Sequence, residues 1–455
     1  MSHRVNALTS DSNTRAAFAL VIAATVVMMI TAGIRLTSGL FLSPINTSTG
    51  LGIASVSLAM AIAQFVWGLA QPVFGAVADR WGAGRAIVIG GLMLATGTAL
   101  TPFVDSQWGL ILTLGILGAA GAGAGSFSVL MGATAQRLPP SQRALASGVV
   151  NAGASTGQLV FAPLAQAMIN AIGWVSAMLW LAATALLTLP LAWPLRRRQA
   201  PATNGASAAS PAPASTTPGA SGTSPASASV TPVEPRPAET SKGTTAATAE
   251  APLGFRAQIR IAFADRNYLF LHAGFFTCGF HVAFLVTHMP GEVALCGLPA
   301  QVSANALALI GLFNIMGSIG AGMLCTRYSM KNILAAMYAS RAVIILVYLA
   351  APKTTLTFYV FAALIGVTWL ATVPPMAGLI GKLFGTRYLA TLFGLTLLSH
   401  QTGAFFGAWL GGLAFAASGG YQWMWYADIV LALAAALISL PIRERSPRAA
   451  APAAA

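Results

Sequence analysis

Residues 16–43 read AAFALVIAATVVMMITAGIRLTSGLFLS, an apolar run with a single charged side chain, Arg35. About 20 apolar residues are enough for a helix to cross the ~30 Å hydrocarbon core of a bilayer. The apolar region of a cleavable signal peptide is shorter, so we expect this segment to remain as a membrane helix. The composition agrees, because 56% of the 455 residues are hydrophobic and only 7% are charged, against about 25% in soluble domains.

Eleven similar runs follow, and the chain is therefore predicted to be an all-α membrane protein with twelve transmembrane helices in two pseudo-symmetric six-helix bundles. The predicted spans are 16–43, 51–72, 86–103, 108–134, 144–171, 174–195, 268–290, 300–325, 332–351, 355–382, 389–417 and 421–441.

The basic residues fall in alternate loops. If the N-terminus is cytoplasmic, nearly all of them lie inside and only Lys353 lies outside. The positive-inside rule then places both termini in the cytoplasm, as a multi-pass protein of the bacterial inner membrane. The net charge of +14 is explained by topology, and no nucleic-acid partner is expected.

Composition also divides the chain. Residues 199–255 are dominated by Ala, Pro, Ser, Thr and Gly, which cannot bury enough apolar surface to fold, and they predict a disordered cytoplasmic linker. On either side we expect a six-helix bundle, over 16–198 and over 256–442. The remaining residues, 1–15 and 443–455, are predicted to be cytoplasmic tails.

The two predicted bundles repeat one another. Thr31, Gly33, Arg35 and Pro44 of the first span are matched in the seventh by residues a constant 246 positions later. These are Thr277, Gly279, His281 and Pro290, and the fifth and eleventh spans match at the same interval. Parallel repeats of this kind place a substrate site near the bilayer midplane, between the halves.

The loop after the second span reads GAVADRWGAGR over residues 75–85. It resembles the signature loop of the major facilitator superfamily, G-x-x-x-D-R-x-G, and lies in the same place. The resemblance implies a gate in which Asp79 pairs with a basic residue on the cytoplasmic side. The predicted gating residues are Gly75, Asp79, Arg80, Arg85 and Arg143. The second-half copy has Thr326 in place of the acid, which predicts a weaker latch there.

Several stretches are similar to bacterial relatives of the monocarboxylate and oxalate/formate porters. Among them are AGIR at 32–35, CGFH at 278–281, WLATVPP at 369–375 and LSHQTG at 398–403. The resemblance implies a secondary transporter of a small organic anion, a monocarboxylate, working by proton symport or anion exchange. Where the oxalate exchanger carries basic residues, in the eighth and eleventh spans, this chain has Asn314 and His400.

Polar side chains inside spans are expected to form the site. Arg35 keeps its charge and suits a carboxylate, so it is predicted to hold the substrate anion; the alternative is that it snorkels or binds carbonyls. The predicted substrate-binding residues are Arg35, Thr31, His281, Thr277, His400, Gln401, Asn314 and Trp369. Histidines titrate near neutral pH, so proton coupling is predicted at His281, His288 and His400, with neutral hydrogen-bonded histidines as the alternative.

Arg341 and Asp428 fall in the ninth and twelfth spans, which are neighbours in the resembled fold. At 1.5 Å per residue both come near mid-membrane, and we predict a structural ion pair. Trp369, close to Pro374 and Pro375, either walls the cavity beside a kink or faces lipid.

No phosphate-binding loop, metal-ligand cluster or nucleophile–base set occurs in the sequence, so neither an enzyme nor a cofactor or metal site is expected. Expected partners are the organic anion, a proton or counter-anion, and lipid, with the chain as a monomer. Two other functions remain open at this point. They are efflux of amphipathic drugs or metabolites, and a non-transporting receptor that signals through the linker.

Overall fold

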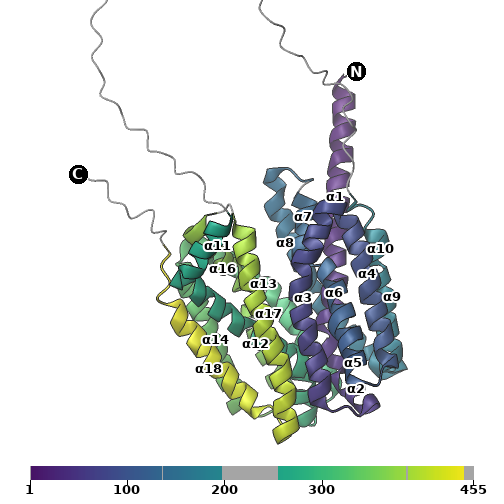
Figure 1. The fold of residues 1–455 in the computed structure, drawn as a ribbon, viewed down its shortest axis with the longest axis vertical. Coiled ribbons are helices and arrows are strands. Elements are labelled where there is room, and N and C mark those ends of the chain that lie inside the picture. The colour runs from purple at the N-terminus through teal and green to yellow at the C-terminus, as the bar shows by residue number, and fades with distance from the viewer. Residues whose placement is uncertain (1, 136, 197–254, 386–387, 445–455) are drawn as a thin grey trace, which may run out of the picture. The chain divides into compact units, whose positions relative to one another are not determined.

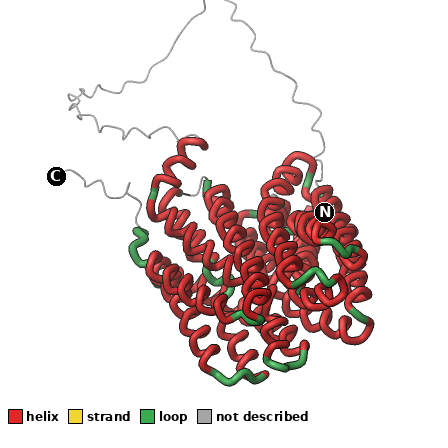
Figure 2. The backbone as a smooth tube through the Cα atoms, turned by 60° about the horizontal axis from the view of Figure 1, so that its bottom comes forward, coloured by secondary structure: helices red, strands yellow, loops and turns green. Residues whose placement is uncertain are grey.

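The computed structural model describes residues 2–135, 137–196, 255–385 and 388–444. Every regular element within them is a helix (Figure 2). Residues 199–254 of the predicted linker and 445–455 of the predicted C-terminal tail lie outside the described residues. The helices on both sides of the gap belong to one compact unit.

The helices follow the order of the predicted spans, with α11 as an additional short helix before the seventh (Figure 1). In the first half the elements are α1 (Ser2–Leu36), η1 (Ser38–Phe41), α2 (Leu42–Thr49), α3 (Ile53–Trp81), α4 (Ala83–Leu100), η2 (Thr101–Phe103), α5 (Gln107–Leu110), η3 (Ile111–Gly118), α6 (Ala119–Ala124), α7 (Phe127–Ala135), α8 (Pro140–Ile172), α9 (Trp174–Leu186) and α10 (Thr188–Leu191). In the second half they are α11 (Phe255–Ala264), α12 (Arg266–Leu295), α13 (Ala300–Arg327), α14 (Met330–Ala350), α15 (Thr355–Thr368), α16 (Val373–Phe384), α17 (Leu389–Ser418) and α18 (Gln422–Ser439).

Ten of these segments are long and apolar enough to cross a membrane within the described part of the chain. Helices α8 and α17 are not among the ten, although they contain 33 and 30 residues. Both carry polar side chains in their middle turns, for example Gln158 and His400. All twelve predicted spans therefore coincide with helices, and the two most polar are the fifth and the eleventh.

Two local features of the sequence set breaks in the helices. Gly82, between α3 and α4, has a φ of 93°, a conformation that only glycine adopts at little cost. The predicted kink in the tenth span is a full break, because α15 ends at Thr368 and α16 begins at Val373 with proline in its first turn. The first helix is longer than the predicted span. It begins at Ser2, so the residues of the predicted N-terminal tail continue α1.

The repeat seen in the sequence is also a repeat in packing. Helix α1 packs mainly against α8, and α12 packs mainly against α17. Gly157 of α8 leaves no room for a Cβ against the carbonyl of Met29, and its repeat mate Gly403 of α17 is equally close to the carbonyl of Phe276. Each half therefore joins its first and fifth spans by the same close approach of backbones.

The halves meet along two seams, α3 with α17 and α8 with α13. Contacts are closest toward the end of the helices where α3 begins. There Gly39 lies against the carbonyl of Val286, and Gly412 lies against Ser57. At the end that carries the 75–85 loop, Gly148 and Gly394 have no atom of another segment within 4 Å of the place a Cβ would occupy.

Candidate functional site

Arg35 of α1 points toward α3. Its guanidinium carbon lies 4.1 Å from the ring centroid of Trp67, and Nη1 donates a hydrogen bond of 3.1 Å to Oε1 of Gln64. Its Nε is buried and has no hydrogen-bond partner. The salt bridges of the described residues are His281–Asp428 and Lys382–Glu444, so Arg35 is a membrane cation without a carboxylate.

The stretch of α3 that contacts Arg35 also contacts the second half of the chain. Gly68, one residue beyond Trp67, is in contact with the side chain of Gln401 on α17. Gln401 donates from Nε2 to Nδ1 of His400 over 3.1 Å, and its own Oε1 is buried without a partner. Arg35 and Gln401 therefore contact the same stretch of α3, whereas the His400 ring lies 4.8 Å from that of Phe275 on α12.

A second group of predicted residues surrounds the break between α15 and α16. Trp369, at the break, is 1% exposed and does not face lipid. Asn314 of α13 accepts a hydrogen bond of 3.0 Å from the Leu370 amide and donates one of 2.8 Å to Ser155 of α8. Backbone freed by a break inside the membrane needs such partners, and Asn314 also ties this break to the first half.

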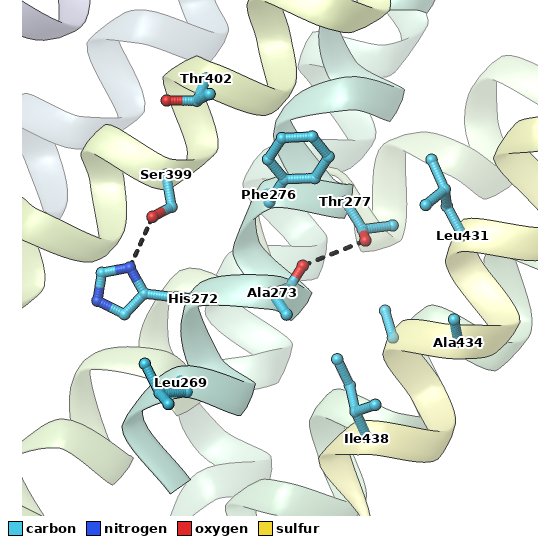
Figure 3. Close-up of a pocket in the computed structure, with 11 residues that line it drawn as sticks. Leu269, His272, Ala273, Phe276, Thr277, Ser399, Thr402, Leu431, Ala434 and Ile438 are labelled. Carbon is cyan, nitrogen blue, oxygen red and sulfur yellow. Dashed lines mark hydrogen bonds between the residues drawn. The ribbon is translucent and has the colours of Figure 1, made fainter. Parts of the chain in front are cut away.

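The two predicted threonines both donate hydrogen bonds to backbone carbonyls, and their substrate contact stays a prediction. Thr31 follows the expected spacing on α1, but its hydroxyl donates to the carbonyl of Gly125 over 3.1 Å and packs α1 against the end of α6. Thr277 donates to the carbonyl of Ala273 one turn earlier on α12. It lines a groove of about 510 Å³ between α12, α17 and α18 (Figure 3).

Arg341 and Asp428, the predicted ion pair, form no direct salt bridge with each other in the described part of the chain, and each has a nearer partner. Arg341, on α14 and 1% exposed, donates from Nη2 to the carbonyls of Thr368 and Trp369, the latter at 2.8 Å. The carboxyl-terminal end of α15 carries partial negative charge, which suits a guanidinium. Asp428 instead contacts His281, with 2.5 Å between Oδ2 and Nδ1. The sequence places His281, Arg341 and Asp428 at similar depth on adjacent helices, but the direction of each side chain decides which of them are partners.

The remaining predicted histidine, His288, is buried against α17. Its Nε2 donates to the carbonyl of Ala408 over 2.8 Å, and its ring stacks 5.1 Å from that of Tyr421. A neutral ring satisfies this arrangement, because no carboxylate contacts it among the described residues. These contacts fit the alternative of a neutral, hydrogen-bonded histidine, and the proton-coupling role of His288 stays a prediction.

The predicted gate lies at the α3–α4 turn. Asp79, Arg80, Arg85 and Arg143 are all exposed. Arg143 donates from Nε to the carbonyl of Leu138 over 3.0 Å, and Arg80 lies over the ring of Trp81. Asp79 has no hydrogen bond or ion pair with any described residue. The pairing expected of Asp79 therefore stays a prediction for another state of the protein.

A small cavity of about 130 Å³ marks the same turn. Gly75, Asp79, Gly82 and Arg137 are among the residues that line it. Arg137 was not among the predicted gating residues. The sequence signal that could have identified Arg137 is its position between α7 and α8, six residues before Arg143.

The second half has an acid at the equivalent loop, but it comes from a distant part of the sequence. Glu444, beyond α18, accepts hydrogen bonds from Ser329, from the Lys331 amide and from Lys382, at 2.5, 2.9 and 3.2 Å. Partial burial opposes ionisation, yet these donors lower the pKa of the Glu444 carboxyl below its ordinary value. Sequence spacing around Thr326 could not reveal this substitute.

Three comparisons place this arrangement among known proteins. The family model of the Major Facilitator Superfamily matches residues 20–408. The chain belongs to this superfamily. Among curated relatives, the oxalate:formate antiporter of Oxalobacter formigenes is 31% identical over 156 residues, 34% of this chain and 36% of the relative. Mouse monocarboxylate transporter 11 is 35% identical over 135 residues, 30% of this chain and 29% of the relative. The matches thus span about a third of each relative.

Solved structures agree on the superfamily fold. A D-xylose–proton symporter has a TM-score of 0.66 at 13% identity, with 93% of this chain and 97% of that chain covered. A bacterial homologue of the human lysosomal transporter Spinster, in an inward-facing, unoccupied conformation, has a TM-score of 0.66 at 15% identity, with 94% and 96% covered. At these identities the likeness establishes the fold. The chain is therefore a multi-pass membrane protein of this transporter superfamily.

Proposed function

We propose that this transporter moves a small organic anion, a monocarboxylate, across the cytoplasmic membrane by alternating access, with a proton or a second anion as the coupled species. The observation that carries the proposal is Arg35. A guanidinium held within a span without a carboxylate leaves its charge uncompensated, which is costly in a membrane protein. A substrate carboxylate supplies the missing charge and matches the planar donor fork.

The surroundings of Arg35 favour a small ligand. Trp67 covers one face of the guanidinium at 4.1 Å, and Gln64 occupies Nη1. The unpartnered Nε of Arg35 and the unpartnered Oε1 of Gln401 provide one donor and one acceptor near the seam between the halves. A carboxylate that also carries a hydroxyl group matches such a pair, because the carboxylate accepts from Nε and the hydroxyl donates to Oε1. The names of the relatives, oxalate:formate antiporter and monocarboxylate transporter, fit carboxylates in general.

The seams suggest how access alternates. The halves are closest where α3 begins, whereas Gly148 and Gly394 face open space at the end with the 75–85 loop. The bias of Lys and Arg puts that loop in the cytoplasm. In this proposal the structure is the state open toward the cytoplasm, and the exposed Asp79 finds its partner when the halves close at that end.

The test is uptake by purified protein in liposomes, with formate, lactate, pyruvate and oxalate as candidate substrates. Arg35→Gln is expected to lower transport by about 30-fold or more, the scale of losing one partner of a buried charge pair. Arg260→Gln, an exposed arginine of α11, is the matched control. Wild-type transport rates in Arg35→Gln, with the protein folded, would refute the anchor. Absence of binding and transport of every carboxylate in the panel would refute the substrate class.

A further inference from the structure

Buried polar atoms without partners concentrate in the second half. They include Nε2 of His281, Oδ1 of Asp428, Nη1 of Arg341, the hydroxyl of Tyr338 and Nε2 of His400. All five residues are at most 6% exposed. Unsatisfied polar groups in a protein interior cost free energy. Their concentration in one region therefore indicates a functional role besides packing.

The centre of this region is a short contact between two titratable groups. Nδ1 of His281 on α12 lies 2.5 Å from Oδ2 of Asp428 on α18, and the side chains are 1% and 0% exposed. With Nδ1 donating to the carboxylate, Nε2 carries the free lone pair of the ring. The carboxylate stabilises an imidazolium, so a proton added at Nε2 has its counter-charge in place.

The net charge around the His281–Asp428 pair depends on the charged and titratable groups that neighbouring helices contribute. Helix α14 contributes Arg341 and Tyr338, α17 contributes His400, and α12 itself contributes Cys278, whose thiol lies beside Arg341 and His400. Helices α15 and α16 contribute the carbonyls that Arg341 binds. Arg341 and ionised Asp428 cancel when His281 is neutral. Protonation of His281 then gives the cluster one positive charge.

The other histidines of the spans lack this support. His288 donates to a backbone carbonyl, Nδ1 of His400 accepts from Gln401, and Nδ1 of His272 contacts the hydroxyl of Ser399 at 2.6 Å. None of the three has a carboxylate partner among the described residues. A charged imidazole without a counter-ion is costly in a membrane, which singles out His281.

The groove in Figure 3 approaches the pair along both of its helices. On α12, Leu269, Ala273 and Thr277 line the groove, and the next residue at the same spacing is His281. On α18, Ile438, Ala435 and Leu431 line it, and the next is Asp428. Residues three or four apart share a helix face, so the groove ends about one turn, ~5 Å, from the pair.

We propose that the proton coupled to transport binds at Nε2 of His281, held by Asp428, and reaches the pair along the α12–α18 groove. This rests on the proposed anion transport and names its coupling site. One proton is taken up at Nε2 from one side of the membrane and released from the same atom to the other. Asp428 stays ionised throughout. Because the pair takes up a single proton in each transport cycle, the predicted stoichiometry is one proton per anion.

Transport in liposomes tests the proposal, with accumulation driven by a pH gradient compared with counterflow of labelled against unlabelled carboxylate. His281→Gln and Asp428→Asn are expected to lower pH-driven accumulation about tenfold or more and to change counterflow little, because exchange needs no net proton movement. Arg260→Gln, at an exposed position of α11, is the control. Ala434→Phe, which fills the groove, is expected to slow pH-driven accumulation while counterflow continues.

Several outcomes would overturn it. Full pH-driven accumulation in His281→Gln would exclude the site, and full accumulation in Ala434→Phe would exclude the groove. Counterflow in the wild type without any response to a pH gradient would refute proton coupling and leave anion transport standing. A readout that needs no substrate is tryptophan fluorescence, since the Trp369 ring lies 5.9 Å from that of His281. Its pH titration is expected to vanish in His281→Gln, and an unchanged titration would contradict the proposal.

Discussion

The first and second halves both hold an arginine inside the membrane, and they treat it differently. Arg35 contacts a glutamine and a tryptophan and has no carboxylate. Arg341 binds two carbonyls at a helix break and lies close enough to Asp428 for electrostatic attraction. The first half therefore presents a fixed positive charge, that of Arg35, without a counter-charge. The second half contains Arg341 and Asp428, whose charges are opposite, together with His281, which can bind a proton.

The largest expected effect comes from adding one methyl group at matched positions of the two halves. Gly279→Ala would place a Cβ against the carbonyl of His400, whereas Gly33→Ala, its repeat mate, meets the ring of Phe161. A ring moves more readily than backbone. We expect Gly279→Ala to cost about 3 kcal/mol or more of stability and Gly33→Ala about 1 kcal/mol. Thermal unfolding in detergent measures both.

The control for this pair is Gly148→Ala, because a Cβ there meets nothing within 4 Å. Alanine is the better helix former, so that variant is expected to be neutral or slightly stabilised. Equal losses in Gly33→Ala and Gly279→Ala would show that the two halves pack alike at this level.

The next largest effect is expected from Arg35→His, which replaces the fixed charge of the first half with a titratable group. In Arg35→His, anion transport at pH 7.5 is expected to fall about tenfold or more and to recover partly below about pH 6.5, the ordinary pKa of histidine. Transport rates across pH 5.5–8 in liposomes clamped at equal pH on both sides check this. Arg260→His is the control, and a rate independent of pH at the wild-type level would contradict the comparison.

A smaller effect is expected at the gate of the first half. Asp79 is exposed and unpaired with described residues, so Asp79→Asn should leave the stability of this state within about 0.5 kcal/mol of wild type. If Asp79 closes the other state, the maximal transport rate nevertheless falls several-fold. Unfolding midpoints and transport rates measured on the same preparation decide it, and unchanged transport would remove Asp79 from the gate.

The smallest effect is expected at the matching loop of the second half, with the opposite pattern. Lys382 is 45% exposed, so Glu444→Gln should cost at most about 1 kcal/mol of stability and leave transport unchanged. Since the pKa of Glu444 is lowered in the folded protein, its contribution is present above the ordinary carboxyl pKa and is lost as the pH falls through the lowered value. Unfolding of wild type and variant should therefore converge in acid.

Much of this architecture could be predicted from the chain alone. Apolar runs separated by basic loops located the helices, ten segments of which are long and apolar enough to cross a membrane in the described part of the chain. A constant interval between repeats anticipated that α1–α8 and α12–α17 would pack alike. The position of Arg35 within a span followed from counting residues. Each of these inferences uses periodicity and length, which depend on the backbone and the bilayer.

The partners of buried polar groups could not be obtained in that way. Asp428 has both His281 and Arg341 on adjacent helices, and helix rotation decides between them. Trp67 was missed beside Arg35, although its spacing of three from Gln64 places both on one face of α3. Glu444 was missed because an acid from the end of the chain replaces one expected near Thr326. Contacts between distant segments have no local signature.

The polarity of α8 and α17 has a consequence for how the protein is made. A nascent helix enters the bilayer according to its own transfer free energy, and His400 with Gln401 at the centre of α17 oppose that step. Asn151, Gln158 and Ser155 do the same in α8. In the folded protein the His400 ring lies against Phe275 of α12 and Gln401 lies against Gly68 of α3. Ser155 of α8 is bound by Asn314 of α13. Stable insertion of the fifth and eleventh spans therefore depends on other spans packing beside them. The residues best suited to handling a substrate are those that make biogenesis cooperative.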